Sequence, residues 1–362
     1  MEMPGWIDRL GGFVERTAGL WVKLGGVESN AMRGELDATP VDRPIYIAGL
    51  ARSGSTILLE LLAAHPDVAT HRYRDYPPIY TPMFWSRAFS NIYRGDAAPV
   101  ERAHKDRILV TPDSPEAIEE VLWMRFFDAR HDPRVSQVLD GATANPAFEA
   151  FYRDHIHKIL IIRQGRRYLA KGNYNVTRLA YLAKLFPDAR FVVPVRAPRG
   201  HVASLAKQHR LFCEQERADP RVLRHMRRVG HFEFGLDRRP LNVGDTEAGL
   251  SIAGLWQAGH EARGLARQWA QVYGFVLDQL EREPGLRERT LLLRYEDVCA
   301  DGHAALGRAF AHVALELPEE RLAPMAARLS APTYYSDGFS SEEIAAIAEE
   351  TVGVASRLGY AA

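Results

Sequence analysis

The stretch Pro44-Ile-Tyr-Ile-Ala-Gly-Leu-Ala-Arg-Ser-Gly-Ser-Thr-Ile-Leu-Leu-Glu-Leu-Leu62 carries the strongest structural signal in this 362-residue chain. An apolar run of β-forming residues ends at Gly49, a short polar loop follows, and from Thr56 onward apolar residues recur at helical spacing. The pattern predicts a strand, a phosphate-binding loop and a helix. Such a loop leaves backbone N–H groups free at a helix N-terminus, where the helix dipole also attracts anions.

The loop departs from the nucleoside triphosphatase pattern at one position. Gly49 and Gly54 have the spacing of the P-loop pattern G-x4-G-K-[ST], but Ser55 stands where that pattern has lysine. In nucleoside triphosphatases this lysine reaches the β- and γ-phosphates, and the hydroxyl after it holds magnesium. With Arg52 in the loop instead, the sequence predicts a site for a shorter anion and no metal ion. A purely structural turn between strand and helix is the alternative interpretation.

Composition restricts the class of protein. The chain is 46% hydrophobic and 25% charged, as in ordinary globular proteins, and its 46 basic and 46 acidic residues cancel, so no nucleic-acid partner is expected. Cys213 and Cys299 lack metal-binding spacing, so we expect neither a disulfide framework nor a zinc site. The first residues lack the features of a signal peptide, and no run approaches the ~18 apolar residues of a membrane span. A cytoplasmic enzyme is therefore expected, and nothing in the sequence indicates its oligomeric state.

The first part of the chain is predicted to lie outside the main domain. Apolar residues in the segment 6–24 recur at intervals of three or four, with charged residues between them, which predicts an amphipathic helix. We expect it to cover the domain or a partner subunit, with peripheral membrane contact as the alternative. Residues 25–43 are expected to form a linker. The predicted organisation is thus a helix and linker over residues 1–43 and a single α/β domain over 44–362.

Further strands and helices predict the fold class. Strands are expected at 167–170, 190–195 and 290–294, and helices at 146–164, at 248–281, after Ser114 and after Ser340, with an inserted helical lid at about 211–246. Helices that alternate with continuous apolar strands are typical of a parallel sheet with both faces covered. We therefore expect a P-loop-like three-layer α/β sandwich with a central, mainly parallel sheet.

A second anion site is predicted at the end of the strand 190–195. That strand ends on Arg196, and Ser204 follows eight residues later in the next helix. A P-loop triphosphatase would have an aspartate at a strand end for its magnesium ion. The planar guanidinium group instead matches the paired oxygens of a phosphate. Arg196 and Ser204 can therefore meet over one anion.

These segments together resemble the PAPS-dependent sulfotransferases, in particular their bacterial and Golgi-type branch. The resemblance is carried by Gly49–Thr56 with His65-Pro66, by Phe186–Arg196 with Ser204, by Leu293–Asp297 and by Leu358-Gly-Tyr360. These segments span residues 44 to 360. The resemblance implies a P-loop-like sheet without ATP chemistry, and 3′-phosphoadenosine 5′-phosphosulfate (PAPS) as co-substrate without a metal ion.

The resemblance also implies roles for individual residues. It implies that the loop binds the 5′-phosphosulfate through Arg52, Ser53, Gly54, Ser55 and Thr56, with Arg52 on the leaving phosphate. Arg196 and Ser204 match the pair that clasps the 3′-phosphate, and Tyr295 falls near a position that meets the adenine in some relatives.

The sequence departs from the family in two places. Ala51 replaces the usual proline before Arg52, and Asn173 stands two residues after Lys171, where cytosolic members have a catalytic histidine. Because an amide nitrogen cannot accept a proton, we expect a carboxylate as base, as in the other branch. The acid in the matching window is Asp75, with the other candidates being His71, Glu116 and Glu120. Lys171 is expected to help neutralise the departing phosphate.

The expected reaction is in-line transfer of the sulfuryl group to a hydroxyl of a carbohydrate or another small-molecule acceptor. Two rival interpretations remain at this point. One is a P-loop small-molecule kinase, which the missing lysine argues against, and the other is a non-catalytic nucleotide-binding protein.

Overall fold

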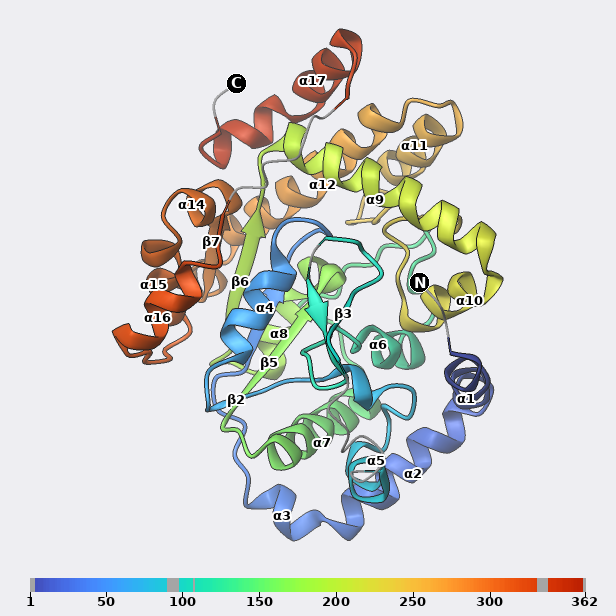
Figure 1. The fold of residues 1–362 in the computed structure, drawn as a ribbon, viewed down its shortest axis with the longest axis vertical. Coiled ribbons are helices and arrows are strands. Elements are labelled where there is room, and N and C mark those ends of the chain that lie inside the picture. The colour runs from blue at the N-terminus through green and yellow to red at the C-terminus, as the bar shows by residue number, and fades with distance from the viewer. Residues whose placement is uncertain (1–3, 90–97, 107, 331–337, 361–362) are drawn as a thin grey trace.

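The computed structural model describes residues 4–89, 98–106, 108–330 and 338–360. At its centre is a parallel five-stranded sheet in the order β2-β5-β1-β6-β7 (Figure 1). The strands are β1 (Ile45–Ala48), β2 (Val68–Ala69), β5 (Arg167–Gly172), β6 (Arg190–Val195) and β7 (Thr290–Arg294). The structure confirms the predicted α/β class and the four longer strands. The sequence did not reveal β2, which has only two residues.

Helices cover both faces of the sheet. On one face, Tyr46 and Ala48 of β1 pack in a core with α7 (Pro146–Arg163), α8 (Leu179–Leu185) and α12 (Glu261–Arg282). On the other face, Ile45 and Ile47 pack with α4 (Ser55–Ala63), α15 (Gly302–His312) and α16 (Glu319–Ala326). Side chains of a strand alternate between faces, so the fully apolar run of β1 fills both cores.

The remaining helices agree in part with the prediction. The segment 248–281 is broken into α11 (Thr246–Gln257) and α12, and the last helix, α17 (Ser341–Arg357), begins at the predicted cap, where Ser340 and Glu343 form a capping box. The predicted lid lies in α9 (Pro198–Ala218), α10 (Pro220–Val229) and the turns after them. Short helices elsewhere in the chain are α5 (Pro82–Phe89), α13 (Pro284–Glu288) and α14 (Tyr295–Ala300).

The predicted start of the helix after Ser114 is wrong. The helix there, α6, covers only Glu120–Phe126, and Ser114 instead closes a turn with Thr111. Pro115 forms a bridge with Arg72, and the Glu116 N–H donates to the carbonyl of His71, so these residues follow the neighbouring chain in an extended form. Glu116 therefore does not lie on the helix that the sequence had predicted.

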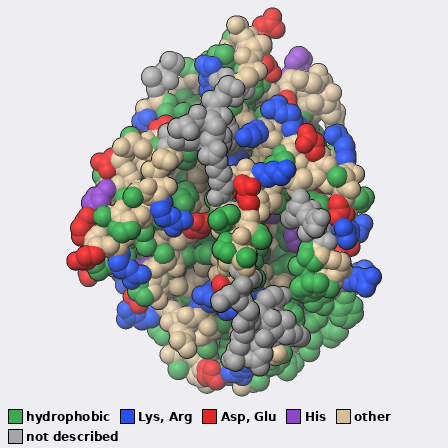
Figure 2. All heavy atoms as spheres, viewed as in Figure 1, with side chains coloured by type: hydrophobic (Ala, Val, Ile, Leu, Met, Phe, Trp, Pro, Cys, Tyr) green, Lys and Arg blue, Asp and Glu red, His purple; other side chains and the backbone are tan. Residues whose placement is uncertain are grey.

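The N-terminal part is more helical than predicted. It forms α1 (Gly5–Arg16), α2 (Ala18–Ala31) and α3 (Arg33–Asp37), so helices replace most of the expected linker. Glu28 of α2 is fully buried and pairs with Lys158 of α7 at 3.0 Å. This buried ion pair fixes α2 to the main domain. Figure 2 shows hydrophobic side chains gathered where α1 and α2 lie, at the lower right of the view.

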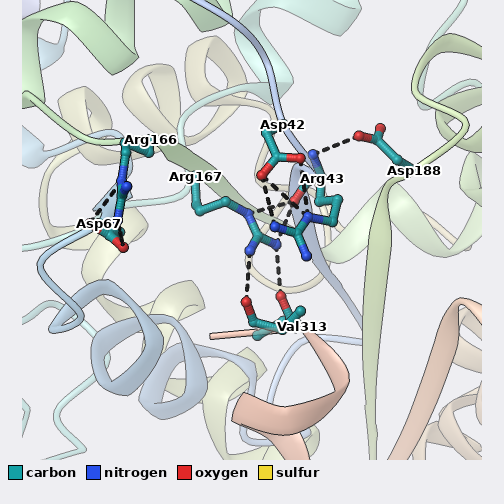
Figure 3. A network of polar contacts seen from close by, with 8 residues as sticks. Asp42, Arg43, Asp67, Arg166, Arg167, Asp188 and Val313 are labelled. Atoms are coloured by element: carbon teal, nitrogen blue, oxygen red, sulfur yellow. Dashed lines mark hydrogen bonds and ion pairs between the residues drawn. The ribbon is translucent and has the colours of Figure 1, made fainter. Parts of the chain in front are cut away.

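The end of the sheet opposite the phosphate loop is tied by arginine contacts (Figure 3). Arg167, at the start of β5, donates to the carbonyl oxygens of Arg43 at 2.8 Å and Val313 at 2.7 Å. The Arg43 N–H in turn donates to Asp188 at 2.8 Å. These bonds join the segments that enter β1, β5 and β6, so the carboxyl ends of the strands remain for the site.

Candidate active site

The phosphate loop has the backbone that its glycines predict. Gly54 has a left-handed φ of 98°, and a Cβ atom there would come within 2.9 Å of the Tyr295 ring. At Gly49 a Cβ atom would lie 3.0 Å from Pro194 at the end of β6. Both positions therefore favour glycine, for conformation at Gly54 and for space at both. The loop turns the chain from β1 into α4, whose first residues, Ser55 and Thr56, supply the helix N-terminus.

Arg52 of this loop already holds an anion from the protein itself. Its Nη1 lies 2.8 Å from the Asp106 carboxylate, and the side chain is 14% exposed. Asp106 comes from the segment between β3 (Val100–Glu101) and β4 (Leu109–Val110), and Arg102 of that segment donates to it at 2.9 Å. Arg102 also approaches the Thr56 hydroxyl at 3.4 Å. In this structure the Arg52 guanidinium group is therefore paired with a carboxylate of the same chain.

The charges around Asp106 favour its ionised form. Burial raises the pKa of Asp106, but the guanidinium groups of Arg102 and Arg52 outweigh it and lower the pKa to about 2. A carboxylate there stays charged at any physiological pH.

The second predicted anion site lies beside the first. Arg52 Nε donates to the Ser204 hydroxyl at 3.3 Å, and Arg196 donates to the Arg52 carbonyl at 3.3 Å. The guanidinium group of Arg196 stacks 4.5 Å above the Tyr295 ring, and the Trp269 indole N–H donates to the Arg196 carbonyl at 3.1 Å. The structure therefore brings together the predicted donor-binding residues of β1, β6 and β7, with Ser204 from α9.

Lys171 lies on the other side of the loop, near the end of β5. It pairs in register with Ile47 of β1 and is 9% exposed. Burial lowers the pKa of Lys171, and the charges of Glu116, Arg102, Glu233 and Arg52 all act on it. Charged groups of both signs thus surround Lys171.

A pocket opens beside Lys171. It is lined in part by Asn173, Tyr174, His231 and Glu233, together with Lys171 itself. Asn173 Nδ2 donates to Glu233 at 2.6 Å, and His231 Nδ1 lies 3.1 Å from the same carboxylate. Asn173 therefore holds an acidic side chain at the position where the family resemblance implied a histidine.

Asp75 is held in a buried ion pair away from this pocket's lining. Arg163 of α7 contacts both of its oxygens, at 2.6 Å for Oδ2, and His71 Nδ1 lies 3.5 Å away. Burial raises the pKa of Asp75, but His71 and Arg163 outweigh this effect and lower it far below the usual range. A carboxylate with occupied oxygens and a lowered pKa is a weak proton acceptor.

The other predicted base candidates have different surroundings. His71 is 1% exposed and its Nε2 lies 3.0 Å from that of His155. Glu120 pairs with Arg178 at 2.7 Å and with His131 at 2.8 Å; burial raises its pKa, but these partners lower it to about 2. Glu116 acts on the pKa of Lys171 through its charge and accepts a hydrogen bond from the Tyr73 hydroxyl, while Glu120 lines the same pocket as Lys171.

Sequence reasoning missed Arg102, Asp106, His231 and Glu233. The first two lie in a run of mixed charges that resembles a solvated surface. A signal did exist for the other two, because a histidine and a glutamate follow Gly230, a typical helix-ending residue, inside the predicted lid.

A parallel sheet covered by helices on both faces, with a glycine loop between β1 and α4, defines an α/β protein of the P-loop-like kind. A family model described as "Sulfotransferase family" matches residues 44–234, more than half of the chain. The chain belongs to the sulfotransferase family.

Individual relatives agree with this assignment, and a solved structure shares the fold. Protein-tyrosine sulfotransferase 1 of Danio rerio is 28% identical over 166 residues, covering 44% of this chain and 34% of that protein. The Homo sapiens protein of the same name is 28% identical over 166 residues, covering 44% and 33%. The chain thus spans about a third of the length of the curated relatives it matches. Sulfotransferase STF9 from Mycobacterium avium shares the fold, with a TM-score of 0.55 at 15% identity over 92% of this chain and 82% of that chain.

The described residues contain no group of three or more His, Cys, Asp or Glu side chains arranged to hold a metal ion. In the same ranges, no helix has the length and apolar character needed to cross a membrane.

Proposed function

We propose that this protein transfers the sulfuryl group of PAPS to a hydroxyl group of an acceptor. The observation that carries the proposal is the meeting of Arg52, Ser204 and Arg196, with the Asp106 carboxylate already in contact with Arg52. Two arginines, a hydroxyl and the loop N–H groups are donors that suit a nucleotide with a phosphate at each end. Asp106 supports this fit because a carboxylate and a phosphosulfate oxygen use the same donors.

In the proposed complex the two clusters hold different ends of the nucleotide. Arg52 and the loop from Ser53 to Thr56 would hold the 5′-phosphosulfate, and Arg196 with Ser204 the 3′-phosphate. Tyr295, which stacks on Arg196 and contacts the loop at Gly54, would lie beside the adenine. PAPS supplies the sulfuryl group.

The protein's charges then assist departure of the phosphate. Arg52, the loop N–H groups and Lys171 would neutralise the negative charge that grows on the departing phosphate oxygen. Preorganised donors of this kind are often worth about 10²–10³ in rate each. The buried position of Lys171 strengthens its effect, since surrounding water would otherwise screen the charge.

The acceptor class is proposed from the relatives and the pocket together. The matched curated relatives are protein-tyrosine sulfotransferases, so phenolic hydroxyls are the first acceptors to test. The pocket beside Lys171 is lined by polar side chains, among them His231 and Glu233, that suit a hydroxyl group. Carbohydrate and aliphatic alcohols form the second arm of the acceptor screen.

Calorimetry with the product nucleotide tests the donor assignment. We expect 3′-phosphoadenosine 5′-phosphate (PAP) to bind without magnesium and ATP to bind much more weakly. Magnesium-dependent binding of ATP instead would support the kinase interpretation. PAP binding without release of PAP from PAPS, with any acceptor tested, would support a non-catalytic nucleotide-binding protein.

A further inference from the structure

His231 and Glu233 form a fixed pair in the pocket beside Lys171. Each oxygen of Glu233 has a partner: Asn173 donates to Oε1 at 2.6 Å, and His231 Nδ1 lies 3.1 Å from Oε2. No hydrogen bond to His231 Nε2 exists among the described residues, and the imidazole side chain keeps 20% of its surface exposed. The imidazole is therefore held through Nδ1, and His231 lines the pocket.

The backbone around His231 is fixed by the end of α10. Gly230 ends this helix with a left-handed φ of 77°, and a Cβ atom there would come within 2.4 Å of Glu120. The N–H of His231 donates to the Met226 carbonyl at 2.9 Å, and that of Phe232 to the Tyr174 hydroxyl at 3.0 Å. The pair thus lies on a turn fixed by hydrogen bonds. Its arrangement, an imidazole held at one nitrogen by a carboxylate, is that of a histidine base and the carboxylate that orients it.

We propose that His231 is the general base of the transfer and that Glu233, itself held by Asn173, positions it. This inference rests on the proposed sulfotransferase function and deepens it. Asn173 occupies the place where cytosolic members of the family have a histidine, and it supports the Glu233 carboxylate that holds His231. Glu233 and Asn173 are positioning residues, because they act through His231.

The proposed step balances in atoms and electrons. The acceptor O–H bond breaks, and its proton moves to His231 Nε2 as the acceptor oxygen forms a bond to the sulfur of PAPS. The bond from sulfur to the 5′-phosphate oxygen breaks, and its electron pair stays on that oxygen, next to Arg52 and Lys171. Solvent then takes the proton from His231.

The charges that face His231 determine its pH dependence. They come from Glu233 on the same turn, Lys171 on β5, Glu116 before α6, His225 on α10 and His104 between β3 and β4. Burial lowers the pKa of His231, but the Glu233 carboxylate outweighs this and leaves the pKa raised. Since a base must be unprotonated, the rate should rise with pH through the pKa of His231. It should fall at alkaline pH as Lys171 loses its charge.

Replacement of His231 tests the proposal directly. Release of PAP from PAPS is measured with p-nitrophenol, a tyrosine peptide or water alone as acceptor. We expect His231→Gln to lower kcat by about 10²–10⁴-fold and to remove the acid limb of the pH profile. PAP affinity should stay within about twofold, since His231 is not among the donor-binding residues. The matched control His225→Gln replaces a histidine of α10 outside the pocket lining and should keep the acid limb.

A second variant keeps the test decisive if His231→Gln does not fold. Glu233→Gln removes the carboxylate that raises the His231 pKa, so the acid limb should move to lower pH. A His231→Gln protein with the wild-type kcat and pH profile would overturn the base assignment. So would a Glu233→Gln protein whose acid limb had not moved. In either case, PAP binding by the wild type would leave the proposed function intact. Wild-type protein that neither binds PAP nor releases it from PAPS would instead overturn the proposed function.

A different observation concerns the outer face of α1 and α2. Trp6, Phe13, Leu20 and Val27 recur every seven residues and are 49%, 47%, 54% and 56% exposed. Basic side chains, also exposed, follow three of them at a distance of three residues: Arg9, Arg16 and Lys23. Together these seven residues form the N-terminal stripe, where Figure 2 shows hydrophobic side chains gathered.

The acidic residues of the same helices are paired with basic residues of the main domain. Asp8 pairs with Arg224 and Arg228 of α10, and Glu15, although exposed, pairs with Arg228 at 2.8 Å. Glu28 is buried against Lys158. The N-terminal stripe itself therefore combines aromatic and aliphatic side chains with basic ones.

The geometry points to an anionic phospholipid surface as the partner of the N-terminal stripe. Helices that lie in a membrane interface have this combination, with aromatic and aliphatic side chains at the acyl boundary and basic side chains on the headgroups. Charge complementarity favours this partner over a second copy of the chain, whose stripe would carry the same positive charge.

Sedimentation with vesicles tests this second proposal. The full chain should bind vesicles that contain phosphatidylserine, bind less at high salt, and bind weakly to phosphatidylcholine alone. Phe13→Ser with Leu20→Ser should abolish binding, and each of Arg9→Ala, Arg16→Ala and Lys23→Ala should weaken it about fivefold. Val352→Ser, a similarly exposed apolar residue on α17, is the control and should change nothing. Absence of vesicle binding, or a dimer in solution that the Phe13 and Leu20 changes dissociate, would overturn the proposal.

Discussion

The two sides of the active site differ in how they are built. On the donor side, the residues come from three strand ends and one helix, and each lies in a short segment with a recognisable pattern. On the acceptor side, Lys171 alone comes from such a segment. Its neighbours Glu116, His231 and Glu233 come from turns far away in the sequence.

The difference shows what decides the role of a charged side chain. Asp75 and Asp106 are both buried aspartates paired with arginine, at side-chain exposures of 11% and 10%. Arg163, the partner of Asp75, belongs to a core helix, whereas Arg52, the partner of Asp106, belongs to the phosphate loop. The partner, not the acid, therefore separates a structural ion pair from one that a ligand can replace.

The largest expected effect is on stability and comes from Asp75→Asn. Removing one charge of a buried pair leaves Arg163 uncompensated and should lower the free energy of unfolding by about 3–5 kcal/mol. In the folded protein the pKa of Asp75 lies below its unfolded value near 3.9, so its stabilisation is complete above about pH 4 and is lost as pH falls. In urea unfolding, the free energy of unfolding of the variant should therefore fall less between about pH 4 and lower pH than that of the wild type. A folded Asp75→Asn protein whose kcat fell as far as that of His231→Gln would return the base assignment to Asp75.

The glycine loop, the strands and the last helix could be predicted because the information for them is local. The glycines of the loop, the buried strand before Arg196 and the cap at Ser340 each depend on neighbours within a few residues. The position of Asp75 depends on Arg163, 88 residues away, and that of Glu233 on Asn173, 60 residues away. No local pattern encodes such pairs. The extended path at Glu116, predicted as helix, likewise depends on pairing with the strand-like segment at Arg72.

The next largest effect is expected from removal of the Arg52 charge on the donor side. Arg52→Ala should lower kcat by about 10²–10³-fold, because the guanidinium group stabilises charge that develops on the departing phosphate. Single-turnover measurement at saturating PAPS separates this loss from weaker binding. Arg166→Ala, which removes an exposed arginine paired with Asp67 at the other end of the sheet, is the control. An unchanged single-turnover rate in Arg52→Ala would remove this residue from the chemistry.

A smaller effect should distinguish binding from chemistry on the same side. Arg196→Ala removes charged hydrogen bonds to the 3′-phosphate, worth about 1.5–3 kcal/mol, so PAP should bind about ten- to a hundredfold more weakly. Ser204→Ala should act in the same direction and less strongly. The decisive comparison uses adenosine 5′-phosphosulfate, which lacks the 3′-phosphate. Its affinity should be the same for the wild type and Arg196→Ala, and an equal loss for both nucleotides would place Arg196 elsewhere on the ligand.

The smallest expected effect has the opposite sign. Asp106 must leave Arg52 before a phosphosulfate can take its place, so the free protein holds a competing anion on its own loop. Asp106→Asn removes that competition and should strengthen PAP binding by up to about tenfold, since partly exposed ion pairs contribute about 1 kcal/mol. The gain should shrink as salt rises, because salt weakens the Arg52 to Asp106 pair of the wild type more than the neutral contact of the variant. Asp113→Asn, which changes an exposed aspartate paired with Arg72, is the matched control. Weaker PAP binding by Asp106→Asn would mean that Asp106 orients Arg52 for the nucleotide. The Arg52 to Asp106 ion pair would then be a structural contact, like the ion pair of Arg163 and Asp75.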